Sequence, residues 1–208
     1  EPSILKEIVV GYDDVAPSKA PSEEELSPHI GVDESGKGDF FGPLVIAAAY
    51  TNEDLYKRLR EIGVQDSKAI TSDKQAIAIA EKIKKILGPT RYAIVRIGNA
   101  AYNRLYAKYK SVNTILAWGH ARAIENLITN IPSCKLAISD QFGNTEEIIK
   151  RALMQKGKSI ELKQRHKAEA DVAVAAASIL AREAFLTSLK QMEEKYTNKF
   201  PKGASPQV

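Results

Sequence analysis

The chain has 208 residues, of which 44% are hydrophobic and 27% charged, and these values are ordinary for one soluble globular core. Its single cysteine, Cys134, excludes an intramolecular disulfide, and we see no membrane-length apolar run and no signal peptide. We therefore predict a cytoplasmic protein with no membrane partner. The net charge of +4 mildly favours a polyanionic partner.

The first 28 residues lack the pattern of a folded domain. Residues 13–28 (DDVAPSKAPSEEELSP) hold three prolines and an acidic triplet, which is typical of a linker. The apolar stretch 4–10 before them predicts one strand or the stub of an upstream domain.

From His29 onward the hydrophobic pattern becomes regular. Apolar runs predict five strands, at residues 29–32, 42–50, 91–97, 135–139 and 159–163, and the first two are close enough to pair as a hairpin. Apolar residues at helical spacing, with start and stop signals, predict four helices. These run from Ser72 to the stop at Gly88, from Ser111 to near Pro132, from Asn144 to Gly157, and from about Ala170 to Tyr196. The order of elements predicts one α/β layer structure with a five-stranded mixed sheet flanked by helices.

The most informative segment is residues 33–39 (DESGKGD), which follow the first strand directly. The carboxylates of Asp33 and Glu34 are hard oxygen ligands for divalent cations. Gly36 and Gly38 let backbone N–H groups approach a phosphate or sugar, and Lys37 adds a positive charge. This combination favours metal-assisted chemistry on a phosphodiester. The same residues could also form a plain glycine turn in a surface loop.

Two further acids lie where this fold places chemistry. Asp140 ends the fourth strand, and sites in open α/β sheets gather at the carboxyl ends of strands. Asp171 lies in the first turn of the last helix. Singly, Asp140 could be a turn acid and Asp171 could complement the helix dipole. Together with Asp33 and Glu34 they offer the ligand set that two Mg²⁺ ions need.

The segment 33–39 closely resembles the signature of type 2 ribonucleases H, and the lysine between its glycines is similar to the ribonuclease HIII branch. The ribonuclease HII group usually has arginine there. The resemblance continues in the family's order, with Asp171 included, through residues 65–68 (QDSK), 112–120 (VNTILAWGH), 140–142 (DQF), 175–182 (AAASILAR) and 200–205 (FPKGAS).

The resemblance implies a ribonuclease H-like fold and endonucleolytic hydrolysis of the RNA strand of RNA–DNA hybrids, by a monomer. It implies that Asp33, Glu34, Asp140 and Asp171 are both the catalytic residues and the ligands of two Mg²⁺ or Mn²⁺ ions. It also implies that residues 1–28 are a linker or the remnant of an upstream substrate-binding domain. Residues 29–208 are then the catalytic domain, ending before the helix that usually follows in the family.

Seven residues are candidates for contacts with the hybrid. Backbone groups at Ser35, Gly36, Lys37 and Gly38 are suited to reading the ribose 2′-OH, and the side chains of Ser67 and Lys68 to phosphate contacts. Lys167 belongs to a basic stretch with Arg165 and His166 that either faces the scissile region or forms a solvated loop. We interpret His29 and His120 as structural and Trp118 as a core residue.

Two other functions remain open at this stage. A structure-selective DNA nuclease could use an acidic cluster on the same fold. A non-catalytic module could bind hybrids without cleaving them. The Gly-Lys-Gly loop argues against the first, and the four acids argue against the second.

Overall fold

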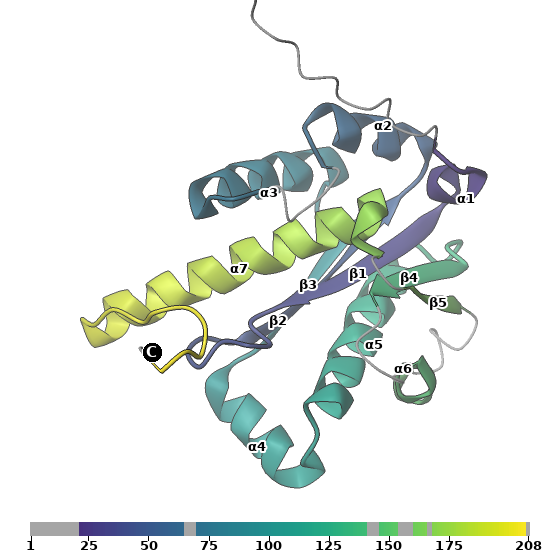
Figure 1. The fold of residues 1–208 in the computed structure, drawn as a ribbon. Helices are drawn as coiled ribbons and strands as arrows, with labels where there is room; N and C mark the ends of the chain where they lie inside the picture. The colour runs from purple at the N-terminus through teal and green to yellow at the C-terminus, as the bar shows by residue number, and fades with distance from the viewer. Residues whose placement is uncertain (1–20, 65–69, 141–145, 154–159, 166–167, 207–208) are drawn as a thin grey trace, which may run out of the picture.

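A computed structural model describes residues 21–64, 70–140, 146–153, 160–165 and 168–206. A five-stranded sheet forms its centre (Figure 1). The strands are β1 (His29–Ser35), β2 (Leu44–Thr51), β3 (Tyr92–Ile97), β4 (Leu136–Asp140) and β5 (Glu161–Arg165). Their order is β3-β2-β1-β4-β5. β1 pairs antiparallel with β2 and parallel with β4, so the predicted hairpin and the predicted mixed sheet are confirmed.

Helices cover both faces of the sheet (Figure 1). On one face lie α2 (Glu53–Glu61), α3 (Asp73–Leu87) and α7 (Val172–Tyr196). On the other lie α4 (Asn99–Tyr109), α5 (Val112–Asn130) and α6 (Glu146–Ala152). Two short elements, α1 (Glu23–Leu26) and the 3-10 helix η3 (Ala168–Ala170), flank the ends of β1 and α7.

The alternation of side chains along β2 explains why its sequence is apolar without a break. Val45, Ala47 and Ala49 are buried with α7 and α3, and Leu44, Ile46 and Ala48 are buried with α5. A strand buried on both faces needs apolar side chains at every position. The central strands are thereby fixed between two hydrophobic layers.

The approach of α7 to β1 depends on Gly31. A Cβ at this position would lie 2.1 Å from the backbone nitrogen of Val174, which no side chain can tolerate. The backbone of α7 therefore lies directly against β1, and the two elements run alongside each other from Asp171 to Phe185. This contact fixes how α7 presents its residues to the end of β1.

Side-chain caps begin the helices where the sequence predicted them. Ser72 Oγ accepts from the Gln75 N–H at 3.1 Å, and Ser111 Oγ accepts from the Thr114 N–H at 3.2 Å. These caps confirm the predicted starts of α3 and α5. Asn144 and Gly157, predicted to bound the third helix, lie outside the described residues.

The structure adds three helices to the predicted pattern and shifts one strand. Helices α1, α2 and α4 were not predicted, and α1 falls within the segment predicted as linker. None of the residues of helix α4 is fully buried, and Ala101, Tyr102 and Leu105 pack against the core only partly buried. Strand β5 covers 161–165 rather than 159–163, because its polar residues up to Arg165 pair with β4, up to Asp140.

One of the described helices, α7, is long and apolar enough to cross a membrane by length and composition. No apolar run of that length was recognised in the sequence. However, 72% of its most apolar window is buried against the sheet and α3, which is the environment of a core helix.

Candidate active site

Asp33 and Asp140 lie at the carboxyl ends of two adjacent parallel strands. The last register pair between β1 and β4 is Val32 with Ser139, so the two aspartates follow side by side. Neighbouring strands are about 4.8 Å apart. Both side chains point to the face covered by α7, because the residues before them, Val32 and Ser139, point to the α5 face. The structure therefore brings this predicted pair together.

Glu34 lies at the same strand end but is held from the opposite face. The buried imidazole of His120 on α5 donates from Nε2 to Glu34 Oε2 at 3.0 Å. The Ser139 hydroxyl lies 3.1 Å from His120 Nδ1. Burial acts to raise the pKa of Glu34, but the hydrogen bond to His120 and the charges of His120 and Lys37 lower it below the usual value. His120, predicted to be structural, is thus hydrogen-bonded to an acid of the candidate site and holds it in place.

The electrostatics of Asp33 are those of a crowded carboxylate. Burial and then the negative charge of Glu34 raise its pKa to about 6. Hydrogen bonds from Ser178 and from the Glu34 N–H, the latter at 2.8 Å, only partly offset this rise. A carboxylate with this environment is one whose charge a bound cation would stabilise.

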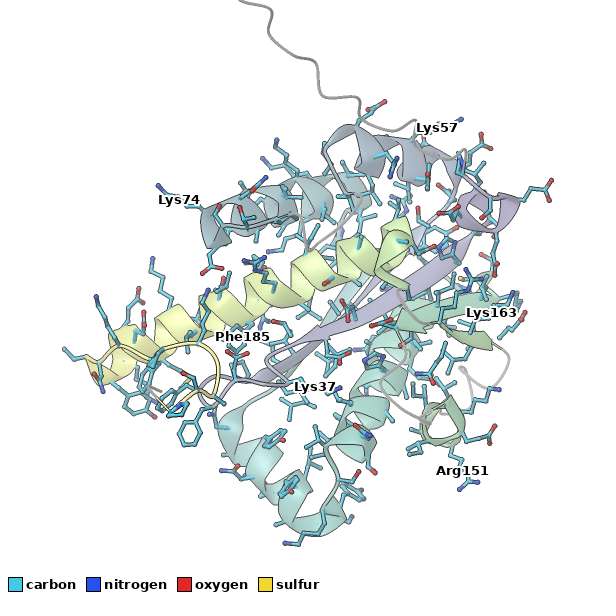
Figure 2. The ribbon with its side chains drawn as sticks, in the orientation of Figure 1. Lys37, Lys57, Lys74, Arg151, Lys163 and Phe185 are labelled. Carbon is cyan, nitrogen blue, oxygen red and sulfur yellow. The ribbon has the colours of Figure 1, made fainter. Side chains whose placement is uncertain are left out.

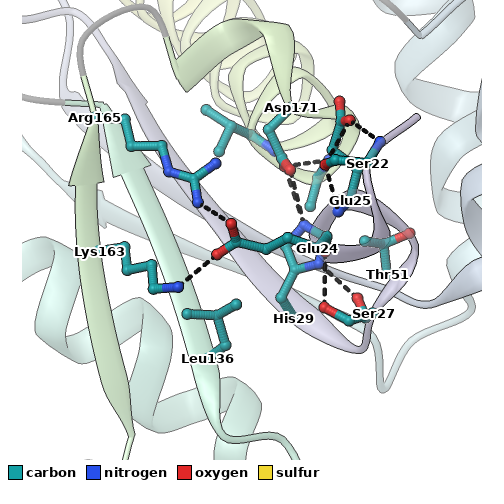
Figure 3. Close-up of polar contacts among 12 residues, drawn as sticks. Ser22, Glu24, Glu25, Ser27, His29, Thr51, Leu136, Lys163, Arg165 and Asp171 are labelled. Carbon is teal, nitrogen blue, oxygen red and sulfur yellow. Dashed lines mark hydrogen bonds and ion pairs between the residues drawn. The ribbon is translucent and has the colours of Figure 1, made fainter. Parts of the chain in front are cut away.

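The structure does not bring Asp171 to this pair. Its carboxylate accepts from Nε2 of His29, the first residue of β1, at 3.0 Å (Figure 3). It also caps α7 through the N–H groups of Ala173 and Val174. His29 and Asp33 are separated by about 13 Å along the strand, since a strand rises about 3.3 Å per residue. Asp171 therefore lies at the opposite end of β1 from Asp33 and Glu34.

The bonds of His29 explain why a buried acid is needed at Asp171. Nδ1 of His29 lies 2.7 Å from the carbonyl oxygen of Ser27, so both ring nitrogens face acceptors. Both must then donate, which requires a protonated ring. Burial acts to lower the pKa of His29, but the hydrogen bond and charge of Asp171 raise it above the usual value. Asp171 serves this buried cation as its counter-ion.

Glu169 is an acid that the sequence reasoning passed over. It lies in η3, which packs against β4, and the N–H of the preceding residue, Ala168, donates to Asp140 Oδ1 at 3.2 Å. The backbone at Glu169 is thus next to Asp140, whereas the side chain of Asp171 caps α7. The stretch 168–171 (AEAD) offers two acids, and the sequence alone does not distinguish them.

The Gly-Lys-Gly loop follows the acids and is packed against α7. Gly36 has φ +89°, and a Cβ there would lie 2.3 Å from the carbonyl oxygen of Pro43 and 3.0 Å from the Phe185 ring. Figure 2 shows Phe185 on α7 and Lys37 on this loop at the same end of the sheet. Lys37 Nζ lies 3.8 Å from Glu34 Oε1. A Cβ at Gly38, in contrast, would meet no described atom within 4 Å.

A cavity of about 240 Å³ lies between this strand end, α3 and α7. Its lining combines one acid and two serines with apolar residues and one arginine: Glu34, Ser35, Ile70, Ala76, Ser178, Ile179 and Arg182. Arg182 donates to the Ile70 carbonyl oxygen at 2.7 Å and to Asp73 Oδ1 at 3.0 Å. Ser35 is thus placed at the site, beside a space that a substrate could enter.

Other predicted contact residues are placed differently or are not described. Ser67, Lys68 and Lys167 lie outside the described residues, as does His166. Arg165 donates to Glu24 of α1, which also accepts from Lys163 at 2.7 Å (Figure 3). Trp118, predicted as a core residue, is 40% exposed on α5 with the Arg122 guanidinium 5.7 Å from its ring centre, so that prediction is wrong.

The donor set can be tested against a divalent cation. Among the described residues, no three His, Cys, Asp or Glu side chains converge closely enough to hold a metal ion. Mg²⁺, however, is usually held by one or two carboxylates and completes its shell with water and substrate phosphate. Asp33 and Asp140 offer such a pair of hard oxygen ligands. The raised pKa of Asp33 means that its ionised form is disfavoured, and a bound cation would stabilise it. The residues therefore fit Mg²⁺ or Mn²⁺.

Comparisons with known proteins all identify one family. The family model described as ribonuclease HII matches residues 30–208. A ribonuclease HIII of Protochlamydia amoebophila is 48% identical over 181 residues, covering 87% of this chain and 58% of the relative. The chain thus spans less than two thirds of that relative's length.

Two solved structures are similar to the fold described above. Bst ribonuclease HIII in complex with Mn²⁺ gives a TM-score of 0.79 at 32% identity, over 88% of this chain and 59% of the other. The ribonuclease HII in the PCNA:ribonuclease HII complex of Archaeoglobus fulgidus gives 0.70 at 30% identity, over 86% and 82% of the two chains.

Proposed function

This chain belongs to the ribonuclease HII family, in its ribonuclease HIII branch, and from that premise we propose that it hydrolyses the RNA strand of RNA–DNA hybrids. The observation that carries the proposal is the placement of Asp33 and Asp140 side by side at adjacent strand ends, with the Gly-Lys-Gly loop following the end of β1. A carboxylate pair beside a phosphate-accessible loop is suited to metal-assisted phosphodiester hydrolysis.

The chain's own residues would prepare the site in distinct ways. Asp33 and Asp140 would hold Mg²⁺ or Mn²⁺, and Glu34, kept ionised by His120 and Lys37, would add negative charge at the same strand end. Two such ions, when bound, supply activation of the attacking water and stabilisation of the leaving oxygen. Ser178 orients the Asp33 carboxylate through its hydrogen bond.

We further propose that Glu169, and not Asp171, is the fourth acid of the site. The support is that the residue before Glu169 is hydrogen-bonded to Asp140, whereas Asp171 is occupied by His29 and by the first turn of α7. An acid already used to neutralise a buried cation and to cap a helix is poorly available as a metal ligand.

Discrimination between RNA and DNA is assigned in this proposal to the loop of Ser35, Gly36, Lys37 and Gly38. The support is its position directly after Glu34 and the open space at Gly38, which would let a sugar approach the backbone. Only ribose offers the 2′-OH, which is both donor and acceptor. We also propose that the protein is a monomer and that it acts in the cytoplasm; the free thiol of Cys134 supports the second point, because a reducing compartment keeps thiols free.

One assay tests the proposed reaction. Purified protein is incubated with Mg²⁺ or Mn²⁺ and three substrates: an RNA–DNA hybrid, a duplex with one embedded ribonucleotide, and an all-DNA duplex. We expect metal-dependent cleavage of the hybrid. Cleavage of the all-DNA duplex would instead support a DNA nuclease, and metal-dependent binding without cleavage would support a binding module.

The matched variants of this assay are Asp140→Asn and Asp54→Asn. Asp140→Asn removes one ligand of the proposed metals and should lower turnover by several hundredfold or more, since several kcal/mol of transition-state stabilisation are lost. Asp54 is an exposed acid on α2, and its substitution should leave turnover unchanged. Near wild-type activity of Asp140→Asn would contradict the assignment of the site.

A further inference from the structure

The loop that follows the candidate acids is held from outside by the segment after α7. Residues 200–203 return from the end of α7 and lie against the turn between β1 and β2 (Figure 1). The Gly203 N–H donates to Asp39 Oδ1 at 2.6 Å, and the Phe40 N–H donates to the Gly203 carbonyl oxygen at 2.9 Å. These two bonds run in opposite directions, so Gly203 is joined to the loop through both its backbone groups.

Asp39 also closes the loop on itself. Its own N–H donates to the Gly36 carbonyl oxygen at 3.5 Å, which completes the turn containing Lys37 and Gly38. The side chain of Asp39 thus links Gly203 to the residue that ends this turn. Phe185 of α7 packs against the other side of the turn, at Gly36.

The segment that supplies Gly203 is itself anchored. The Phe200 N–H donates to Glu193 Oε1 at 3.1 Å, and the Phe200 ring lies 5.0 Å from that of Phe41. Lys202 Nζ donates to Asp73 Oδ2 at 2.5 Å, and Asp73 also accepts from Arg182. The segment is therefore fastened to α7 and to the start of α3 before it reaches the loop.

We propose that Asp39 is a positioning residue, which holds the Gly36–Gly38 turn in its substrate-reading conformation by clamping it to Gly203. The inference rests on the proposed function for its effect on catalysis. A turn held from both sides does not have to be ordered when the substrate binds, and ordering one residue costs conformational entropy. The clamp should therefore act on substrate binding more than on the chemical step.

The test compares three variants of the full chain. Asp39→Ala removes the acceptor of the Gly203 N–H, Asp39→Asn keeps an oxygen acceptor without the charge, and Asp54→Ala removes an exposed acid on α2 as the control. For hybrid cleavage we expect Asp39→Ala to raise KM about tenfold with kcat changed less than about twofold. Asp39→Asn should recover most of this loss, and Asp54→Ala should match the wild type.

Amide hydrogen exchange of the same variants gives a readout that does not depend on activity. In Asp39→Ala the amides of Gly203 and Phe40, which donate the two hydrogen bonds of the clamp, should exchange at least about tenfold faster than in Asp54→Ala. If the wild type does not cleave hybrids, the proposed function fails while this exchange result still decides the clamp. Unchanged exchange, or faster exchange with unchanged KM in an active enzyme, would overturn the proposal. A fall in kcat alone would mean a general structural role and would overturn it as well.

If Asp39→Ala does not fold, Asp39→Asn and Asp39→Ser carry the same comparison. Serine is shorter and should not reach Gly203, so its KM and exchange rates should move toward those expected for the alanine variant. Equal behaviour of the asparagine and serine variants would contradict a role for the hydrogen bond.

Discussion

At the scale of single residues, Asp33 links electrostatics to stability. In the unfolded chain its carboxyl group titrates near the ordinary value of 3.8, whereas burial and the charge of Glu34 raise the pKa in the folded protein to about 6. Between these two values the folded protein keeps a proton that the unfolded chain has lost. The stability of the metal-free protein should therefore fall as the pH rises from about 4 to about 6, and the penalty is complete above that range.

Asp33→Asn should remove this penalty. In metal-free buffer at pH 7.5 we expect the free energy of unfolding to rise by about 1–3 kcal/mol, because two pKa units correspond to about 2.7 kcal/mol and the hydrogen bonds of the carboxylate are weakened. At pH 3.5 the gain should disappear. Denaturant titrations of this variant and of Asp54→Asn at both pH values measure the difference. An equal effect at both pH values would mean that the charge of Asp33 is not the cause.

A second residue-scale prediction distinguishes the role of Asp171 from that of Glu169. Asp171→Asn keeps a good helix cap but loses the charge opposite His29, so it should lower stability by about 1–3 kcal/mol while most hybrid cleavage is retained below the melting temperature. Glu169→Gln should do the reverse, with a large loss of turnover and little change in melting temperature. Cleavage rates and thermal melts of the two variants are measured together. Loss of activity in Asp171→Asn at unchanged stability would restore Asp171 to the site.

At the scale of elements, the Gly-Lys-Gly turn contains two glycines with different tasks. Gly36 combines a positive φ with close contact to Pro43 and Phe185, so Gly36→Ala should destabilise the fold by about 2 kcal/mol or more. Gly38 has open space around its Cα, so Gly38→Ala should leave the melting temperature unchanged. Any loss of hybrid cleavage in Gly38→Ala then reports on contact with substrate.

The measurement for this turn is a thermal melt and a KM for each alanine variant. We expect Gly38→Ala to raise KM for the hybrid at an unchanged melting temperature. Gly63→Ala is the control for Gly36, because Gly63 also has a positive φ and open space but lies after α2, away from the site. If Gly38→Ala cleaves hybrids like the wild type, recognition of the ribose lies outside this turn.

The elements also show which parts of the structure are readable from the sequence. The strands around Val32 and Ile46 and the capped starts of α3 and α5 were predictable, because the local pattern reflects burial on the sheet. Helix α4 was not predicted, and its apolar residues Ala101, Tyr102 and Leu105 are only partly buried against the core. The sequence prediction ended β5 too early, at Lys163. The polar end of this strand is held by Glu24, which is 139 residues from Lys163 in the chain and leaves no local signal.

The same limit applies to the site. Asp33, Glu34 and Asp140 were predictable because strand ends mark their positions. The placement of Asp171 depends on His29, which is 142 residues away, and this tertiary contact leaves no local signal. Glu169 lies two residues before Asp171, and the residue that precedes it, Ala168, donates a backbone hydrogen bond to Asp140.

At the scale of the whole molecule, the chain presents a modest positive charge to a polyanionic substrate. Its net charge is +4, and Lys37 of the Gly-Lys-Gly turn lies next to Glu34. The chain spans 58% of the length of its Protochlamydia relative, so a binding surface of the longer protein need not lie within it. Binding of hybrid by this polypeptide should rest on few phosphate contacts.

Hybrid binding should therefore be weak and steeply dependent on salt. If about three phosphates are neutralised, the slope of log K against log salt is about −2.7, and affinity falls about fortyfold between about 50 and 200 mM salt. Fluorescence anisotropy with the Asp140→Asn variant measures this without cleavage. Lys37→Ala in that background should reduce the slope by about 1. Lys57→Ala, which removes a lysine paired with Glu53 on α2 at the opposite end of β2, should leave the slope unchanged. A nanomolar complex that is insensitive to salt, or an equal effect of the two lysines, would show that the hybrid binds to a different surface of the molecule.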